Sequence, residues 1–290
     1  MLKVPSLIIG MTIVAMGTSL PETSVSISAS MNNQNTLAVS NVVGSNIFNL
    51  MVVLGVCAVI AELKVSKDVL KRDYPFSVLC AILLLVAGVI GMTLGRMDGI
   101  IFLVIFAVFI FYLIKSALDA RKRGEISEKE REMNEEMEEM KDLPVWKCIL
   151  YIVGGAIAIK YGGDWVVDSA SVIATSFGIS ATLVGLTICS VGTSLPELVT
   201  SIVAARKNEL DMAVGNVVGS NVFNILMVLG IAATVSPIAF LTENIIDIVV
   251  LLVFSLITWV LCVTQKKLSK KEGILMLVLY TIYLVYICIR

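Results

Sequence analysis

Residues 17–22 read Gly-Thr-Ser-Leu-Pro-Glu, and they interrupt an apolar run that begins at Val4 and resumes at Val25. The same six residues recur at 192–197. A carboxylate, two hydroxyls and a helix-breaking proline thus occur together in a segment apolar enough to lie in a membrane. A carboxylate at that depth costs about 3 kcal/mol unless it faces a polar cavity or a partner. We therefore interpret the rest of the chain as a scaffold that brings the two copies together.

The composition is typical of a helical membrane protein. The 290 residues are 58% hydrophobic and 16% charged, with a mean hydropathy of +0.94, whereas soluble domains are about one quarter charged. Much of the charge lies between Asp119 and Asp142, and the remaining apolar runs reach the roughly 20 residues that a helix needs to cross a bilayer. The net charge of −1 provides no basic surface for nucleic acid. The expected fold class is an all-α polytopic membrane protein.

The apolar runs predict nine spans, the first broken near Pro21 and the sixth at Pro196. They cover residues 4–30, 36–61, 76–94, 99–117, 146–177, 181–205, 212–235, 245–263 and 273–289. All six cysteines lie in or at the edge of these spans. We expect them to be small buried apolar side chains.

An internal repeat explains the odd number of spans. A shift of 175 residues aligns residues 9–55 with 184–230 without a gap, and 26 of the 47 pairs are identical. Five predicted crossings separate matching positions, so the two copies are expected to face opposite sides of the membrane. Inverted repeats of this kind are typical of secondary transporters. A full span precedes the second motif but only residues 1–6 precede the first, so we expect one helix of the repeated unit to be missing at the N-terminus.

The charges predict the orientation independently. Basic residues gather in the loops at 64–72, 121–141, 206–207 and 266–271, whereas the loops of the opposite side carry only Arg96, with Arg290 at the end of the chain. The positive-inside rule makes the first side cytoplasmic. We thus expect a multi-pass protein of the cell membrane with its C-terminus outside. Its expected parts are a first half (1–118), a charged cytoplasmic linker (119–144) and a second half (145–290).

The repeated motif predicts a cation site. Glu22 and Glu197 occupy equivalent positions in inverted copies, so they can meet near the midplane. Each proline removes a backbone donor, which we expect to free carbonyl oxygens around Ala15 and Ser190. Hydroxyl oxygens are added by Thr18, Ser19, Thr193 and Ser194. Hard cations such as calcium and sodium prefer such an oxygen cage, whereas soft metals prefer thiolate or imidazole.

The next span of each copy supplies further oxygen ligands. Residues 41–49 read Asn-Val-Val-Gly-Ser-Asn-Ile-Phe-Asn and are matched at 216–224. Residues four apart share one helix face, so a polar stripe is expected to continue toward the glutamates and to ligate cations through Ser45, Asn49, Ser220 and Asn224. We expect hydrogen bonds between helices, rather than ligation, from Asn41, Asn46, Asn216 and Asn221. Glycines at 44 and 219 are expected to let helices approach closely.

The paired Gly-Thr-Ser-Leu-Pro-Glu motifs, each followed by a Gly-Asn-x-x-Gly-Ser-like segment, resemble the α-repeats of the cation/calcium exchanger superfamily. The resemblance is closest to prokaryotic sodium/calcium exchangers and covers the chain apart from a first helix. It implies ten helices in two inverted halves of about five, which exchange calcium for sodium or protons by alternating access. It also implies that Glu22 and Glu197 bind both ions, that the motif hydroxyls or carbonyls assist, that Ser45 and Ser220 complete outer sodium sites, and that Asn49 and Asn224 line the centre. Some relatives have Asp in place of Asn224, and Asn at this position resembles potassium-independent exchangers.

Calcium/sodium antiport is the leading hypothesis. Calcium/proton antiport is the alternative because buried glutamates can accept protons, although the Ser45 and Ser220 oxygens favour sodium. A cation channel could use similar broken helices, but two carboxylates at a closed site favour tight binding over fast conduction. Paired acids could serve an intramembrane hydrolase, yet no substrate cleft is indicated and no enzyme activity is expected. Calcium, sodium and the lipid bilayer are the expected partners, with no cofactor and no nucleic acid, and the oligomeric state stays open.

Overall fold

The structure is a computed structural model that describes residues 10–123, part of the positions from 144 to 177, and residues 178–265 and 267–290. The first copy of the repeat forms the π-helical segment η1 (Gly10–Val14), α2 (Ala15–Thr18), α3 (Leu20–Met31), α4 (Asn35–Phe48), the π-helical segment η2 (Asn49–Val53) and α5 (Leu54–Ile60). It is followed by β1 (Leu63–Lys64), the π-helical segment η3 (Val69–Asp73), α6 (Tyr74–Val89), β2 (Thr93–Leu94) and α7 (Arg96–Arg123).

The second copy has the same order of elements. It forms α10 (Ala181–Val184), η4 (Gly185–Cys189), α11 (Ser190–Thr193), α12 (Leu195–Arg206), α13 (Leu210–Phe223), η5 (Asn224–Val228) and α14 (Leu229–Val235). After it come β3 (Ile238–Ala239), α15 (Thr242–Gln265), β4 (Lys267–Leu268) and α16 (Lys270–Ile289).

Six helical stretches of the described chain are long and apolar enough to cross a membrane. They are Asn35–Ile60, Val69–Val89, Arg96–Ser116, Leu210–Val235, Thr242–Thr264 and Lys270–Ile289. The pair Ala181–Thr193 and Leu195–Arg206, bent by 42°, adds one more if it is counted as a single span. These stretches correspond to seven of the nine predicted spans. The fifth span and the start of the first fall largely outside the described residues, so the total of nine stays a prediction.

Two predicted positions are wrong. The first motif helix breaks at Ser19, near Pro21 as predicted, but the second breaks at Ser194 and not at Pro196; both prolines lie in the first turn of the following helices α3 and α12. Proline is tolerated there because the first turn of a helix needs no backbone donor. The third span starts at Val69 instead of Phe76, because the charged turn before it is also helical.

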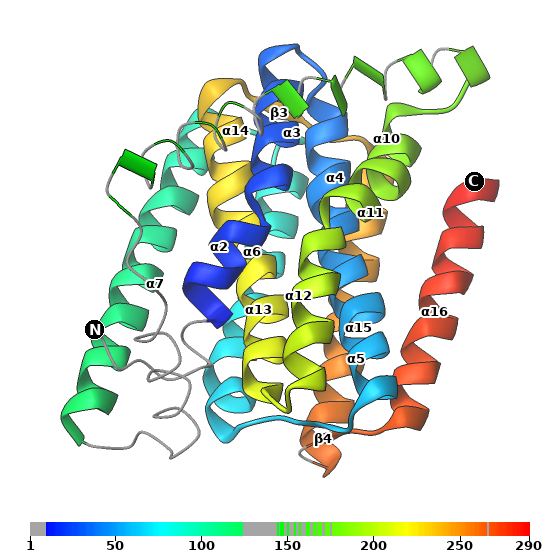
Figure 1. The fold of residues 1–290 in the computed structure, drawn as a ribbon. Coiled ribbons are helices and arrows are strands. Elements are labelled where there is room, and N and C mark those ends of the chain that lie inside the picture. Colours follow the sequence, from blue (N-terminus) through cyan, green and yellow to red (C-terminus); the bar gives the residue numbers. More distant parts are fainter. Residues whose placement is uncertain are drawn as a thin grey trace.

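The helices that follow the motifs form the core. In α4–η2–α5 and α13–η5–α14, 78% and 83% of an apolar stretch of 18 residues is buried. In α7 and in α16 only 22% of the corresponding stretch is buried. The first part of each broken helix packs on the opposite copy, η1 and α2 on α13, and η4 and α11 on α4. The second part packs on both copies, α3 on α4 and on α14, and α12 on α13 and on α5. Figure 1 shows these elements side by side, with α7 on the left of the bundle and α16 on the right.

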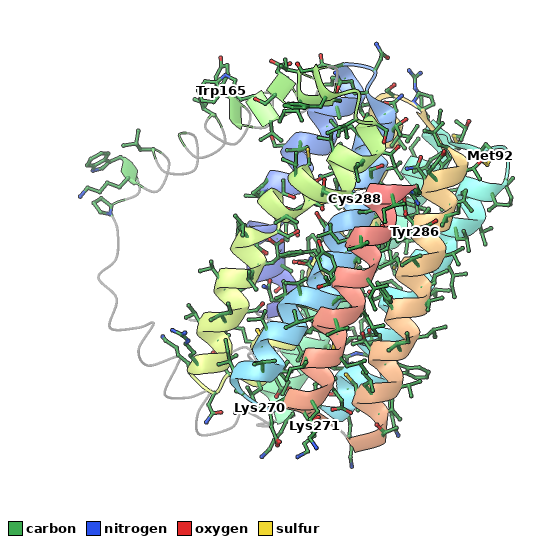
Figure 2. All side chains as sticks on the ribbon, turned by 90° about the vertical axis from the view of Figure 1, so that its right-hand side faces the viewer. Met92, Trp165, Lys270, Lys271, Tyr286 and Cys288 are labelled. Atoms are coloured by element: carbon green, nitrogen blue, oxygen red, sulfur yellow. The ribbon has the colours of Figure 1, made fainter. Side chains whose placement is uncertain are left out.

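Two short antiparallel bridges lie at opposite ends of the bundle. β1 pairs with β4 (Leu63 with Leu268), and β2 pairs with β3 (Leu94 with Ile238). Figure 1 shows β4 at the lower end and β3 at the upper end. In Figure 2, α16 starts beside Lys270 at the lower end and reaches Cys288 near the upper end, where Met92 also lies.

The prediction of buried cysteines is confirmed for four side chains, Cys57, Cys80, Cys189 and Cys262, and is wrong for Cys288. The sixth, Cys148, lies outside the described residues. Cys288 is exposed because it lies in the last turn of α16, which packs on the bundle along one side only.

Candidate cation site

The two helix breaks place both motif glutamates at helix N-termini in the core. Ser19 and Ser194 leave the helical region of backbone space, with ψ near 6° and 5°, and a new helix starts directly after each. Glu22 and Glu197 therefore lie in the first turns of α3 and α12, and neither is exposed to solvent. The positive end of a helix dipole favours a negative charge at this position.

Each glutamate is held by the serine of the opposite copy. Ser194 Oγ donates to Glu22 Oε1 at 2.9 Å, and Ser19 Oγ donates to Glu197 Oε1 at 3.2 Å. The predicted meeting of the two motifs is thus confirmed, with hydroxyls and carboxylates paired crosswise. Sequence reasoning placed all four side chains in one site but missed this exchange, because a repeat does not show which copy a side chain faces.

The threonine hydroxyls also contact the opposite copy. Thr18 Oγ1 lies 3.5 Å from Ser220 Oγ and donates to Asn216 Oδ1 at 3.3 Å. The equivalent contacts join Thr193 Oγ1 to Ser45 Oγ at 3.4 Å and to Asn41 Oδ1 at 3.4 Å. The structure therefore brings the predicted hydroxyls of the motifs beside those of the next spans.

Asn41 and Asn216 link neighbouring helices, as predicted. Asn41 Nδ2 donates to Ser26 Oγ at 3.2 Å, and Asn216 Nδ2 donates to Ser201 Oγ at 3.0 Å. These bonds join α4 to α3 and α13 to α12. They fix the two asparagines while their Oδ1 atoms receive the threonine hydroxyls.

A second pair of asparagines orients the central ones. Asn46 Nδ2 donates to the carbonyl of Asn221 at 3.2 Å, and Asn221 Nδ2 donates to the carbonyl of Asn46 at 3.3 Å. A backbone carbonyl can only accept a hydrogen bond, so the Nδ2 of each asparagine must face it. The Oδ1 of the same side chain then points to a different residue. Asn221 Oδ1 accepts from Asn49 Nδ2 at 3.3 Å, and Asn46 Oδ1 accepts from Asn224 Nδ2 at 3.1 Å. The Oδ1 atoms of Asn49 and Asn224 are consequently left unused.

Four buried oxygens of this site have no hydrogen-bond partner in the part of the chain that the structure describes. They are Glu22 Oε2, Glu197 Oε2, Asn49 Oδ1 and Asn224 Oδ1. Two further oxygens without partners among the described residues, Ser30 Oγ and Asn35 Oδ1, lie at the end of α3 and the start of α4. A buried polar atom without a partner costs about 1–3 kcal/mol, and more if charged. Four such acceptors from two carboxylates and two amides fit a cation that prefers oxygen ligands.

The prediction that carbonyls around Ala15 and Ser190 lose their hydrogen bonds is wrong. The Ala15 carbonyl accepts from the Ser19 amide at 3.0 Å, and the Ser190 carbonyl accepts from the Ser194 amide at 3.1 Å. The reason is geometric, because a helical N–H bonds four residues back, so the proline at 21 affects the carbonyl of Gly17. The Ala15 carbonyl also accepts from the Thr18 hydroxyl at 3.4 Å, and the Ser190 carbonyl accepts from the hydroxyls of Thr193 at 3.4 Å and Ser45 at 3.5 Å. The role of Ala15 and Ser190 as cation ligands stays a prediction.

Two glycines permit the close contact of the copies. A Cβ atom at position 44 would lie 2.8 Å from Ser190 Cβ, and one at 219 would lie 2.8 Å from the Cα of Met11. The predicted close approach is thus confirmed.

Sequence reasoning missed the π-helical turns of the site. η2 and η5 begin at Asn49 and Asn224, and η1 and η4 precede the two motifs at equivalent positions. Such turns are frequent at functional sites. A single sequence gives no signal for them, because the hydrophobic pattern does not record a shift in backbone pairing.

Comparisons with known proteins show what the chain is similar to. The model of the family described as "Sodium/calcium exchanger protein" matches residues 1–115 and 147–289. The inner membrane protein YrbG of Escherichia coli is 39% identical over 263 residues, which cover 88% of this chain and 79% of YrbG. The sodium/calcium exchanger MaX1 of Methanosarcina acetivorans is 30% identical, with 98% of this chain and 89% of MaX1 covered.

A solved structure has the same fold. The sodium-calcium exchanger NCX_Mj, soaked with sodium and calcium, superposes with a TM-score of 0.71 at 30% identity. The match covers 98% of this chain and 87% of that chain.

Proposed function

Because the chain belongs to the sodium/calcium exchanger family and is a multi-pass membrane protein, we propose that it exchanges calcium for sodium across the membrane by alternating access. The observation that supports this most directly is the set of four buried acceptor oxygens without partners, contributed equally by the two copies. Relatives named as exchangers support cation exchange in general. The choice of sodium is our proposal.

The charge of the site requires a cation. Glu22 and Glu197 are fully buried, and no lysine or arginine pairs with either among the described residues. Two buried like charges without compensation carry a desolvation penalty of several kcal/mol per ion. One calcium ion neutralises both carboxylates, and sodium ions or protons can do the same when calcium leaves. Competition for the same carboxylates then couples the two fluxes.

The ligands proposed for these ions are the residues predicted from the sequence. Calcium takes six to eight oxygens, and the carboxylates of Glu22 and Glu197 with the amide oxygens of Asn49 and Asn224 form the centre. The hydroxyls of Ser45 and Ser220, each beside a motif threonine, are proposed to complete sodium sites. The remaining proposed ligands are Thr18, Ser19, Thr193, Ser194 and the carbonyls of Ala15 and Ser190.

We propose that the two copies are inverted halves of about five helices each. β1 and β3 occupy equivalent positions in the repeat, yet they join bridges at opposite ends of the bundle, which supports inversion. The proposed parts are residues 1–118, the cytoplasmic linker 119–144 and residues 145–290. Lys64, Lys267 and Lys270 lie at the β1–β4 end, and by the positive-inside rule they support a cytoplasmic location for that end. The linker lies almost wholly outside the described residues.

Substitution of either glutamate tests the shared site. Glu22→Gln and Glu197→Gln should each abolish sodium-driven calcium uptake into vesicles, because one carboxylate cannot neutralise calcium in a buried site. The matched control is Glu62→Gln. Glu62 is exposed and pairs with Lys267 at 2.8 Å, and this hydrogen bond lowers its pKa from the ordinary value. Uptake retained in both core variants would refute the proposal.

The driving ion is tested by comparing two gradients. Calcium flux into vesicles should follow an imposed sodium gradient and should be insensitive to a pH gradient of equal free energy. Flux driven by the pH gradient alone would favour calcium/proton exchange. Flux without counter-movement of any cation would indicate a channel.

A further inference from the structure

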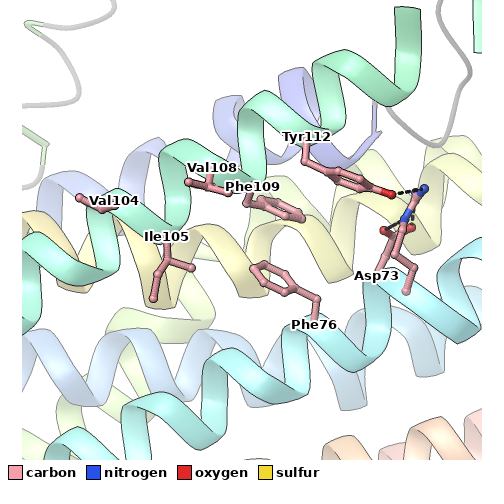
Figure 3. A pocket seen from close by; sticks show the side chains of 8 residues that line it. Asp73, Phe76, Val104, Ile105, Val108, Phe109 and Tyr112 are labelled. Carbon is pink, nitrogen blue, oxygen red and sulfur yellow. Dashed lines mark hydrogen bonds and ion pairs between the residues drawn. The ribbon is translucent and has the colours of Figure 1, made fainter. Parts of the chain in front are cut away.

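A groove of about 430 Å³ lies between α7 and the segment η3–α6 (Figure 3), and none of its lining residues belongs to the cation site. It is lined by Arg72, Asp73, Phe76, Val104, Ile105, Val108, Phe109 and Tyr112. Val104 and Val108 are 58% and 62% exposed. In a multi-pass membrane protein such side chains face the bilayer, so the groove is open to lipid.

The walls of the groove suit an acyl chain. The rings of Phe76 and Phe109 stack at 4.7 Å between centroids and 13° between planes, which closes its inner side. From Val104 to Phe109 every lining side chain is apolar. The stretch from Val104 to Tyr112 is about 12 Å of helix, and a lipid chain can lie along it.

One end of the groove is polar and carries an anchored arginine. Arg72 donates from Nε and Nη2 to both oxygens of Asp73, at 2.6 and 3.0 Å, and from Nη1 to the Tyr112 hydroxyl at 3.4 Å. The Asp73 side chain is 1% exposed and that of Arg72 is 30% exposed. The guanidinium also lies over the Tyr112 ring, 5.4 Å from its centroid. Arg72 is thus fixed by a buried carboxylate at the mouth of an apolar groove.

The fixed guanidinium retains capacity for an anion. Arginine has five N–H donors in a planar fork that suits phosphate oxygens. Three of them are used, and two have no partner among the described residues. Exposed lysines stand close by, with Lys71 next to Arg72 and Lys115 one turn beyond Tyr112. Asp68 is an exposed acidic residue of the same stretch. The two lysines outnumber it, so this end of the groove carries an excess of positive charge.

We propose that the groove between α6 and α7 binds one anionic phospholipid, with its phosphate at Arg72 and one acyl chain along Phe109, Val108 and Val104. The apolar length selects a lipid over a soluble phosphate. The basic end selects an anionic headgroup over a zwitterionic one. A bound lipid would contact both outer segments, which also meet through the stacked rings of Phe76 and Phe109 and the hydrogen bond from Arg72 to Tyr112.

Native mass spectrometry of the full chain in detergent tests this, with phosphatidylglycerol and phosphatidylcholine of identical chains as probes. We expect phosphatidylglycerol to bind at least about five-fold more tightly, since each basic side chain near a membrane surface contributes about that factor. Val108→Trp fills the groove and should weaken phosphatidylglycerol binding about five-fold or more. The matched control, Val253→Trp, changes a 48% exposed valine of α15 and should leave binding unchanged.

The headgroup contact is tested by removing both members of the ion pair, so that no buried charge remains. The double variant R72Q/D73N should bind the two lipids equally. Equal affinity of the unaltered protein for both lipids, or equal effects of V108W and V253W, would overturn the proposal. Displacement of phosphatidylglycerol by millimolar glycerol phosphate would also overturn it, because it would show an anion site without a chain site. If R72Q/D73N does not fold, the lipid preference and the two tryptophan variants still decide the matter.

Discussion

Each glutamate of the site uses its two oxygens differently. Oε1 of Glu22 and of Glu197 accepts a serine hydroxyl from the opposite copy, and Oε2 has no partner in the described part of the chain. A half-satisfied buried carboxylate is energetically unfavourable. Its geometry is nevertheless fixed by the first bond, so the second oxygen is oriented before any cation arrives.

The serine bonds should therefore control ion affinity. Ser194→Ala removes the 2.9 Å bond to Glu22. Hydrogen bonds to charged groups contribute about 1.5–3 kcal/mol, so we expect calcium binding at least about ten-fold weaker, measured by isothermal titration calorimetry. Thr281→Ala is the control, because its hydroxyl donates to the Leu277 carbonyl within the same helix, on an exposed face of α16. An unchanged affinity for calcium in S194A would show that Glu22 binds calcium without the hydrogen bond from Ser194.

The asparagine pair should control the orientation of the amide ligands. Asn221→Ala removes the acceptor of Asn49 Nδ2, so the Asn49 amide can turn its donor toward the cation. We expect weaker calcium binding in N221A with sodium binding weakened in parallel, by titration calorimetry. The control Asn35→Ala also loses a bond to a backbone carbonyl, that of Pro237, but lies outside the site. Similar effects of N35A and N221A would assign the loss to stability alone.

At the scale of elements, the site depends on helices that are interrupted at defined positions. The sequence predicted the broken helices from a proline in an apolar run, and it predicted the polar face of α4 from the four-residue spacing of Ser45 and Asn49. It placed the second break at Pro196, because the composition does not show which residue leaves the helical torsions, and the structure has the break at Ser194. The π-helical turns η2 and η5 and the crosswise packing of α2 on α13 depend on contacts between segments far apart in the chain.

Close packing between these elements gives a prediction about stability. Gly219→Ala would place Cβ 2.8 Å from the Met11 Cα and 2.9 Å from Ala15 Cβ, so α13 must move away from η1 and α2. Overpacking of this kind costs about 1–3 kcal/mol, and thermal unfolding in detergent should show a lower midpoint. Gly192→Ala is the control, because nothing lies within 4 Å of the added Cβ. A midpoint for G219A at or above that of G192A would contradict the tight contact.

For the whole molecule, the principal feature is that each copy is completed by the other. α5 packs on α16 and α14 packs on α7, so the outer helices also cover the opposite copy. The repeat and the charge pattern were sufficient to predict two facing halves. They were not sufficient to predict which surfaces meet, because identical motifs are equally compatible with contacts within a copy and between copies.

The proposed orientation can be measured with a native cysteine. Cys288 is exposed near one end of α16, whereas Lys270 and Lys271 lie at the other end (Figure 2). In intact cells a membrane-impermeant maleimide should label Cys288, and Cys288→Ser should abolish this signal. Lys270→Cys in the C288S background should react only after permeabilisation. Labelling of both positions from the same side would show that α16 does not cross the membrane.

The crosswise bonds between Ser19 and Glu197 and between Ser194 and Glu22 also have a genetic consequence. A substitution at Ser19 alters the surroundings of a carboxylate 178 residues away, so compensating mutations are to be sought in the other copy of the repeat. Duplicated segments usually diverge once each is free to specialise. Here a substitution in one motif alters the hydrogen bonding of the glutamate in the other motif. We therefore expect selection to constrain the two motifs to change together.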